Sequence, residues 1–182
     1  MNKTEIKVFT IADYEEEEIW LRQQHQKGWK IMKMIPPCFY IFESCEPEDV
    51  IYRLDFRNRE QSEEYLQMVK DFGWEYVGQC VGWLYLRKKA DEAQTAEESE
   101  LFSDNPSKVE MITKIVKTRI MPLTVLFLAS VVPNFIRFLD GEYIGPWGTV
   151  FGIFTAFMFV LYVYLLTHCG LKLKMLKKKY EC

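Results

Sequence analysis

The sequence predicts an α+β protein in which a duplicated βαββ soluble domain is followed by a two-helix transmembrane hairpin. Two observations predict this fold class. A Gly-Trp dipeptide follows an acidic run with helix-forming composition at residues 28–29 and again at residues 73–74. Farther along the chain, residues 120–136 and 143–171 carry no charged side chain. One chain of 182 residues therefore joins a soluble half to a membrane half.

An offset of 45 residues, applied without gaps, aligns the two Gly-Trp pairs and much of what surrounds them. It places Trp20 on Tyr65, Leu21 on Leu66, Ile6 on Ile51, Phe9 on Leu54, Ile11 on Phe56, Tyr40 on Tyr85 and Ile41 on Leu86. Because an internal repeat decides the whole architecture, it is considered first. We interpret residues 1–89 as two copies of one unit.

The first copy begins with a predicted strand near residues 4–11. A helix follows over "YEEEEIWLRQQHQK", and a capping box of Asp13 with Glu16 is expected at its start. Strands near 29–35 and 38–44 complete the copy, and Pro36-Pro37 marks the turn between them.

The second copy repeats this order, with a strand near 50–57, a helix over "QSEEYLQMVKDF" and strands near 74–80 and 82–88 that turn at Val81-Gly82. Asn58 and Gln61 are the predicted capping box. The apolar stripe expected at helical spacing consists of Tyr65, Leu66, Val69 and Phe72.

Gly28 and Gly73 stand where a helix ends in a residue of positive φ, just past its C-cap. The tryptophan that follows each glycine is then expected to fold over the last helical turn and to begin the next strand. The alternative is that Trp29 or Trp74 contacts a ligand directly.

Both faces of the expected six-stranded sheet are apolar. Tyr40 and Phe42 alternate with Phe39 and Ile41, and Trp83 and Tyr85 alternate with Leu84 and Leu86. Two helices cover only one face of such a sheet, so something other than water is expected on the second face. The candidates are the other half of the pseudo-dimer, a second subunit, a ligand and the membrane surface.

The membrane half is expected to span residues 108–182, with crossings near 120–138 and 144–171, each long enough at about 20 residues per crossing. Lysine and arginine side chains before the first span and in the basic C-terminal tail predict a multi-pass protein of the bacterial cell membrane with both termini cytoplasmic. The domain formed by residues 1–89 is then cytosolic. Pro122, Pro133 and Asn134 mark either a packing face or a kink in the first span, or are simply tolerated there.

Residues 90–107 hold six acidic side chains and no basic one, which predicts a flexible, solvated linker. Residues 1–107 carry 13 basic and 22 acidic side chains, a net charge of −9, whereas the remaining residues carry 10 and 4, a net charge of +6. A domain this acidic is a poor candidate for nucleic-acid binding, because phosphate contacts need a basic surface.

Catalytic motifs are absent from the sequence, which predicts a protein that is not an enzyme and needs no cofactor. The five cysteines include no CxxC pair, and His25 and His168 are the only histidines. His25 is expected to face solvent in the last turn of its helix, where the helix dipole favours it.

The stretch "EEEEIWLRQQHQKGWKIMKMIPPCFYIFESCEPEDVIYRLDF", the later "FGWEYVGQCVGWLYLRK" and the paired apolar spans resemble the bacterial membrane-protein family catalogued as domain of unknown function 2812. The resemblance covers the soluble half. It implies a regulatory setting, because members are found mainly in Gram-positive bacteria and are often encoded beside PadR-type transcriptional regulators. No catalytic residue is carried over.

The duplicated βαββ order also resembles the two-repeat module of gyrase-inhibitor-like proteins, whose halves enclose a cleft for amphipathic, often cationic, small molecules. This resemblance directs attention to aromatic walls beside an acidic residue, which suit a cation. The candidate ligand-binding residues are Tyr40, Phe42, Arg53, Asp55, Trp83 and Tyr85. The alternative is that the aromatic residues form core or a dimer interface.

Two functions follow as hypotheses. The first is a membrane-anchored sensory or regulatory module that binds a small amphipathic ligand or a regulator protein, such as one of PadR type. The second is an accessory subunit of a larger membrane complex, such as a transporter, in which the hairpin makes the essential contacts. Membrane lipid is an expected partner in both, and a homodimer is compatible with either.

Overall fold

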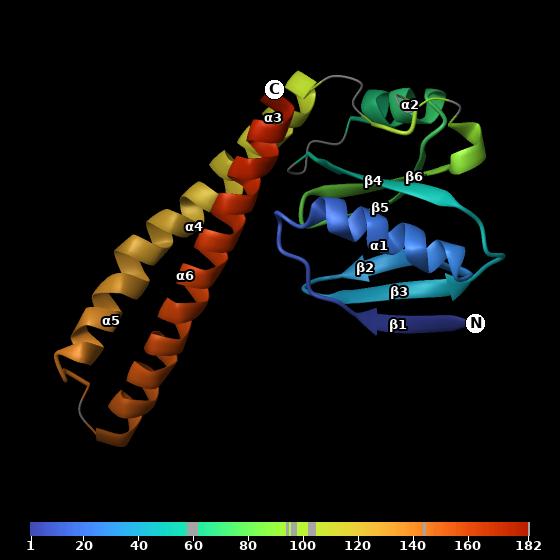
Figure 1. Ribbon diagram of the computed structural model, residues 1–182. Coiled ribbons are helices and arrows are strands. Elements are labelled where there is room, and N and C mark those ends of the chain that lie inside the picture. Colours follow the sequence, from blue (N-terminus) through green and yellow to red (C-terminus); the bar gives the residue numbers. More distant parts are fainter. Residues whose placement is uncertain (58–61, 94, 96–97, 102–104, 144, 182) are drawn as a thin grey trace. The chain divides into compact units, whose positions relative to one another are not determined.

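The computed structural model describes residues 1–57, 62–93, 95, 98–101, 105–143 and 145–181. The chain divides into two units, Met1–Met111 and Ile112–Cys182, and each is described by itself. The first unit holds the strands, and the second is helical (Figure 1).

Two halves of the first unit have the same order of elements. The first half consists of β1 (Asn2–Ile6), α1 (Tyr14–Gln26), β2 (Trp29–Ile35) and β3 (Phe39–Ser44). The second half consists of β4 (Val50–Phe56), α2 (Glu63–Asp71), β5 (Glu75–Cys80) and β6 (Trp83–Lys89). Each half forms an antiparallel three-stranded sheet, β1-β3-β2 in the first sheet and β4-β6-β5 in the second sheet. The α+β class and the βαββ order are confirmed.

The expectation that two helices cover one face of a single six-stranded sheet is wrong. Figure 1 shows α1 between the two sheets and α2 on the far side of the second sheet. The Trp20 ring of α1 lies 4.8 Å from the Tyr40 ring of the first sheet. On the other side of α1, the Tyr14 ring lies 5.3 Å from the Trp83 ring of the second sheet. Part of the second apolar face is therefore covered by the opposite half of the molecule.

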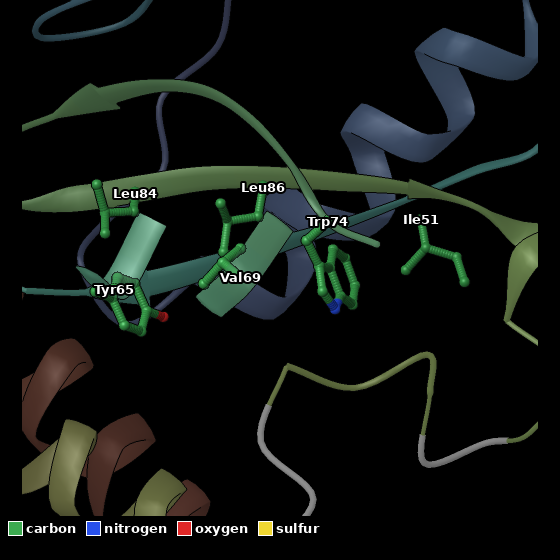
Figure 2. Packing of buried hydrophobic residues seen from close by; sticks show 6 residues of the cluster. All are labelled: Ile51, Tyr65, Val69, Trp74, Leu84 and Leu86. Atoms are coloured by element: carbon green, nitrogen blue, oxygen red, sulfur yellow. The ribbon is translucent and has the colours of Figure 1, made fainter. Parts of the chain in front are cut away.

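The far side of the second sheet packs on α2 (Figure 2). Tyr65 and Val69 of α2 form a buried cluster with Ile51, Trp74, Leu84 and Leu86. Burying an aliphatic or aromatic side chain stabilises a fold by roughly 1.5–3 kcal/mol, so this cluster is a major source of stability. Phe72, predicted as part of the apolar stripe, is instead the exposed C-cap of α2.

Both helices end at the predicted glycines. Gly28 and Gly73 have a φ of +81°, and their amides donate to the carbonyl oxygens of His25 and Lys70. A side chain at residue 28 would also crowd the carbonyl oxygen of Cys45, because a Cβ there would lie 3.0 Å from it. Glycine is therefore needed at this helix end for conformation and for space.

The helix starts differ from the predicted capping boxes. Asp13 occupies the N-cap of α1 but makes no side-chain cap hydrogen bond; its carboxylate accepts from the amide and hydroxyl of Thr10. Ser62 is the N-cap of α2, where its hydroxyl oxygen accepts from the Tyr65 amide. The predicted pair Asn58 and Gln61 lies outside the described residues. Short polar residues near a helix start compete for the cap, and only the backbone course decides between them.

Among the strands, the constant 45-residue offset holds for β2 and β5 only. Both strands have an irregularity at matching places, between Ile31 and Lys33 and between Tyr76 and Gly78. Ile31 pairs with Phe42, whereas Tyr76 pairs with Leu86, which follows Phe42 by 44 residues. The β5–β6 hairpin loop is one residue shorter, so Tyr40 corresponds to Leu84 and not to Tyr85.

The first strands depart further from the offset. Ile6 pairs with Phe39 after the hairpin of the first sheet, and Phe56 pairs with Trp83 at the matching place in the second. Ile6 therefore corresponds to Phe56 and not to Ile51. The predicted strand near 4–11 ends at Ile6, and Phe9 leaves the sheet to place its ring 5.6 Å from that of Trp20.

The described residues of the predicted linker are attached to the first unit. Ala90–Glu92 form a short 3-10 helix, and Ala90, Ala93 and Leu101 pack against the buried cluster beneath α2. Glu100 pairs with both Arg53 and Lys108. Ala90, Ala93 and Leu101 are therefore partly buried, whereas Asp91 and Glu92 are exposed to solvent. The flexibility of residues 90–107 as a whole stays a prediction.

The second unit contains two long apolar helical stretches. One runs through α3 (Asn105–Ile115), the π-helical segment Val116–Ile120, α4 (Met121–Leu126), the π-helical segment Phe127–Val131 and α5 (Val132–Leu139); the other is α6 (Gly145–Glu181). Both stretches are long and apolar enough to cross a membrane, and they include the described residues of the predicted spans.

The two π-helical segments end two residues before Pro122 and Pro133. Proline removes an amide donor and collides with the carbonyl of the preceding turn, so a wider turn before it relieves the clash. The predicted importance of these prolines is thus local: they alter the helix without ending it.

Candidate functional site

Four of the six predicted ligand-binding residues surround α1 inside the first unit. Tyr40 and Phe42 come from β3, Trp83 and Tyr85 come from β6, and all four are buried. They do not share one sheet face, because they belong to two sheets, but both sheets turn these side chains toward α1. The structure places this aromatic set in the core around a helix.

An acidic residue does stand between the aromatic walls, and it is Glu17 of α1. Its Oε1 accepts from the Tyr40 hydroxyl at 2.9 Å and from the Tyr85 hydroxyl at 2.7 Å. Burial raises the pKa of Glu17, although both hydrogen bonds oppose the rise. Burial also raises the pKa of Tyr85 far above its usual range, so both tyrosines remain donors. This polar junction connects α1 to both sheets.

Asp55 and Arg53 lie on the other face of the second sheet, as their shared position on β4 predicts. Asp55 accepts from the Tyr65 hydroxyl and from Arg57 Nε, both at 2.7 Å. Arg53 instead pairs with Glu18 at 3.2 Å and with Glu100 at 2.9 Å. The structure therefore distributes the six predicted residues over separate networks and does not bring them to one cavity.

A cleft of about 340 Å3 lies where the two halves meet. His25, Lys30 and Cys45 line it from the first half, and Glu75 and Arg87 line it from the second. None of the six predicted residues lines this cleft. We take it as the candidate binding site, because it joins groups from both halves of the repeat in a concave surface.

Opposite charges balance each other around the cleft. Its cationic side chains are Lys30, Arg87, Lys88 and Lys89, and its anionic ones are Glu46, Glu48, Glu75 and Glu92. Arg87 holds Glu75 in a bidentate pair at 2.6 and 2.7 Å, which lowers the pKa of Glu75. Lys89 pairs with Glu48 at 3.3 Å. The mixed lining suits a ligand that carries both signs of charge.

His25 is a buried member of the lining, as are Val50 and Lys88. The expectation that it faces solvent is wrong, because α1 is enclosed by both sheets and His25 turns toward the second one. Its Nδ1 lies 2.7 Å from the Tyr52 hydroxyl of β4. Burial and the nearby Arg87 lower the pKa of His25, which leaves the ring neutral near pH 7. Burial raises the pKa of Tyr52 to about 12. A ring that accepts from Tyr52 at Nδ1 carries its proton on Nε2, whereas the other tautomer donates from Nδ1 to the Tyr52 oxygen.

The cleft contains one cysteine, Cys45. Burial raises the pKa of the Cys45 thiol, which disfavours the thiolate form that a nucleophile needs. Among the described residues, no group of three or more histidine, cysteine or acidic side chains is arranged to hold a metal ion.

A second cavity, of about 480 Å3, lies beside α2 and β5. Leu66, Trp74 and Tyr76 contribute apolar surface to it, with Glu63 and Lys70 at its rim. Its lining comes from α2 and from the start of β5, at the edge of the second sheet.

Sequence reasoning missed His25 because a histidine in a last helical turn is usually exposed. A signal was nevertheless present: Tyr14, Glu18, Leu21 and His25 recur at helical spacing, and all four are buried. Their stripe is the side of α1 that packs on the second half. Because Glu18 and His25 are polar, a search for apolar periodicity does not detect this stripe.

The sequence pattern of the family described as "Protein of unknown function (DUF2812)" matches residues 13–125. The chain belongs to this DUF2812 family. The matched region begins at the N-cap of α1 and extends through both halves into the first apolar helical stretch. Neither the curated proteins nor the solved structures contain a match to the chain.

Proposed function

We propose that this DUF2812 protein is a membrane-anchored, non-catalytic sensory or regulatory module, and that its cleft binds a small amphipathic molecule with a zwitterionic polar end. The observation that carries the proposal is the charge-balanced cleft between the two halves, with neutral His25 at its base. Two apolar helical stretches would hold this cleft beside a bilayer, where amphiphiles accumulate. In this proposal, a regulator protein is the partner that responds to whether the cleft is occupied.

The test is thermal unfolding of the full-length protein in a nonionic detergent. Single-chain amphiphiles of equal chain length, with zwitterionic, cationic or anionic head groups, are added in turn. A bound ligand raises the unfolding temperature by mass action. The zwitterionic series should raise it more than the other two.

Variants assign any such shift to the cleft. His25→Phe, and Arg87→Gln combined with Glu75→Gln, should abolish the zwitterion-specific shift, whereas Asp71→Asn, exposed on α2, should retain it. Equal shifts from all three head groups, or retention of the shift in both cleft variants, would exclude the cleft as the site. Tyr85 and Asp55 are unsuitable positions for this test, because both are buried and their replacement alters folding.

The accessory-subunit function is the second candidate, and the exposed apolar side chains of the second unit favour it. Leu128, Phe154, Phe157 and Val160 are all exposed. Asn134, which this function would use for contacts, accepts a hydrogen bond from the Tyr143 hydroxyl at 2.9 Å within the same unit.

Replacing residues 112–182 by an unrelated two-helix anchor tests this alternative. An accessory subunit should lose its cellular partner in cross-linking followed by mass spectrometry. A sensory module should keep its partner, because the first unit makes the contacts.

A further inference from the structure

The outer face of the first sheet, which points away from α1, is apolar and exposed. Ile6, Ile35 and Phe39 are neighbours in register on this face, and 69%, 42% and 38% of their surfaces are accessible. Ile41, two residues after Phe39, extends the same face. We call this set the outer face.

The corresponding residues of the second half are all buried. By strand register, Ile6 corresponds to Phe56 and Phe39 to Trp83, and the strand alternation then matches Ile41 with Tyr85. Trp83 and Tyr85 pack against α1, through the Tyr14–Trp83 ring contact and the Tyr85–Glu17 hydrogen bond, and the Phe56 ring packs on that of Trp83. In the second sheet, the surface that corresponds to the outer face is covered by α1, a helix of the first half. The outer face of the first sheet has no such helix on it among the described residues of the first unit.

The helix that corresponds to α1 is α2, and its outward side is open as well. Counted from the two Gly-Trp pairs, Leu21 corresponds to Leu66 and His25 to Lys70. Leu21 is fully buried against the second half, whereas Leu66 is half-buried and lines the 480 Å3 cavity, and Lys70 is exposed. One molecule therefore carries both parts of the internal interface unpaired, one at each end of its repeat.

We propose that first units of this chain stack head to tail, with the outer face of one copy packed on α2 of the next, as the second sheet packs on α1. Charge supports the match. Within one molecule, Glu17 of α1 contacts Tyr85 of the second sheet. Ser62 corresponds to Glu17 and Ile41 to Tyr85, so Ser62 of one copy would meet Ile41 of the next. Exposed Lys33 lies beside Ile41, and Glu63 and Glu64 follow Ser62 in the acidic first turn of α2. This interface is independent of any ligand in the cleft.

Mixing of variants tests the proposal with the full-length protein in detergent, with its mass measured by light scattering. The wild type should form assemblies of two or more copies. Ile6→Glu disrupts the outer face, and Leu66→Glu disrupts the outward side of α2. Each variant alone should therefore be monomeric. A mixture should form dimers that contain one copy of each, because each variant keeps the end that the other lacks.

Three outcomes would overturn the proposal: a monomeric wild type, assembly that survives Leu66→Glu, or variants that do not form mixed dimers. Assembly lost with Ile6→Glu but kept with Leu66→Glu would indicate pairing of two outer faces. If Leu66→Glu fails to fold, a cross-linking experiment takes the place of this variant. A photoreactive phenylalanine analogue is then incorporated at residue 39. Cross-links to residues 62–70 of another copy support stacking, and cross-links to any other place, or none, contradict it.

Discussion

At the scale of single residues, the core is unusual in burying glutamate carboxyl groups at the contact between α1 and both sheets. Glu17 accepts hydrogen bonds from one tyrosine of each sheet, and Glu18 accepts from the Leu54 amide of β4 at 2.8 Å. A polar group that is buried costs free energy unless it is hydrogen-bonded, so these contacts are specific to one arrangement of the halves. α1 is positioned by directional bonds as well as by apolar contact.

Replacing Glu17 by alanine should destabilise the first unit by about 3 kcal/mol, because the hydroxyls of Tyr40 and Tyr85 lose a buried acceptor. Urea unfolding followed by tryptophan fluorescence measures the effect. Glu16→Ala is the matched control, since Glu16 is exposed in the same helical turn, and its change should stay within about 0.5 kcal/mol. A similar free energy of unfolding for both variants would show that the junction adds little stability.

Stability should decrease as the pH rises from about 7 to about 8, because burial raises the pKa of Glu18 from 4.5 to about 8. The unfolded chain has already released this proton at pH 7, whereas the folded chain still binds it. A rise in pH therefore favours unfolding, by at most about 1.4 kcal/mol per pH unit. His25, whose pKa is lowered, acts in the opposite direction but below about pH 6.5, outside this window.

Glu18→Gln should reduce the loss in free energy of unfolding per pH unit between about pH 7 and about pH 8. Urea unfolding at several pH values measures this slope. Some slope should remain, because the pKa of Glu17 is raised as well. A wild-type protein equally stable at pH 7 and 8, or a variant with an unchanged slope, would contradict the assignment to Glu18.

At the scale of elements, the β5–β6 hairpin turns on two residues of positive φ, Val81 at +49° and Gly82 at +89°. Such two-residue turns match the twist of the strands and favour Asn-Gly, whereas a β-branched valine is strained in the left-handed region. Val81→Asn should therefore raise the free energy of unfolding by about 1 kcal/mol. Val81→Ala is the control. It should raise the free energy of unfolding by less, because alanine lacks the preference of asparagine for the left-handed region. A loss of stability in Val81→Asn would contradict the argument.

Helix packing in the second unit depends on Gly152. A Cβ at this position would collide with the Phe138 ring, whereas a Cβ at Gly170 of the same helix meets nothing within 4 Å. Small residues at such contacts let membrane helices approach closely. Gly152→Leu should lower the unfolding temperature of the detergent-solubilised protein clearly, and Gly170→Leu should leave it nearly unchanged. Equal effects would mean that the contact with Phe138 does not control packing.

Element order was predictable because it depends on local sequence, whereas strand correspondence was not. Gly28 and Gly73 end helices through their own backbone preference, and Pro36-Pro37 and Val81-Gly82 lie at the predicted hairpins. The pairing of Tyr40 with Tyr85 failed because the second hairpin loop is one residue shorter than the first. A one-residue shift moves every side chain of a strand to the other face, and an ungapped comparison does not detect it.

At the scale of the whole molecule, the distribution of basic residues predicts that both termini lie in the cytoplasm. A fluorescent protein that folds only in the cytoplasm should therefore fluoresce when fused to either end. A periplasm-dependent or surface-dependent reporter should be active only when inserted in the connecting turn near Gly141. Adding lysines at this turn is the control, since it weakens the charge bias and should reduce the preference. Activity of the external reporter at either terminus would exclude this topology.

The candidate site itself was beyond prediction from sequence. Its lining comes from both halves, and His25, Arg87 and Glu75 meet there only because α1 lies between the two sheets. Four of the six residues chosen from the sequence were aromatic residues of strands with two apolar faces. This pattern identifies surfaces that avoid water without identifying what covers them.

By itself, the sequence determined the α+β class, the βαββ order in each half, the helix ends at Gly28 and Gly73 and the two apolar helical stretches. These features depend on local conformational preference and on periodicity within one element. Only the tertiary structure decided that α1 is enclosed by two sheets, that Tyr40 and Tyr85 share Glu17, and that His25 is buried beside a charged cleft. Those outcomes depend on how separate elements pack on one another, and packing is a property of side chains distant in the chain.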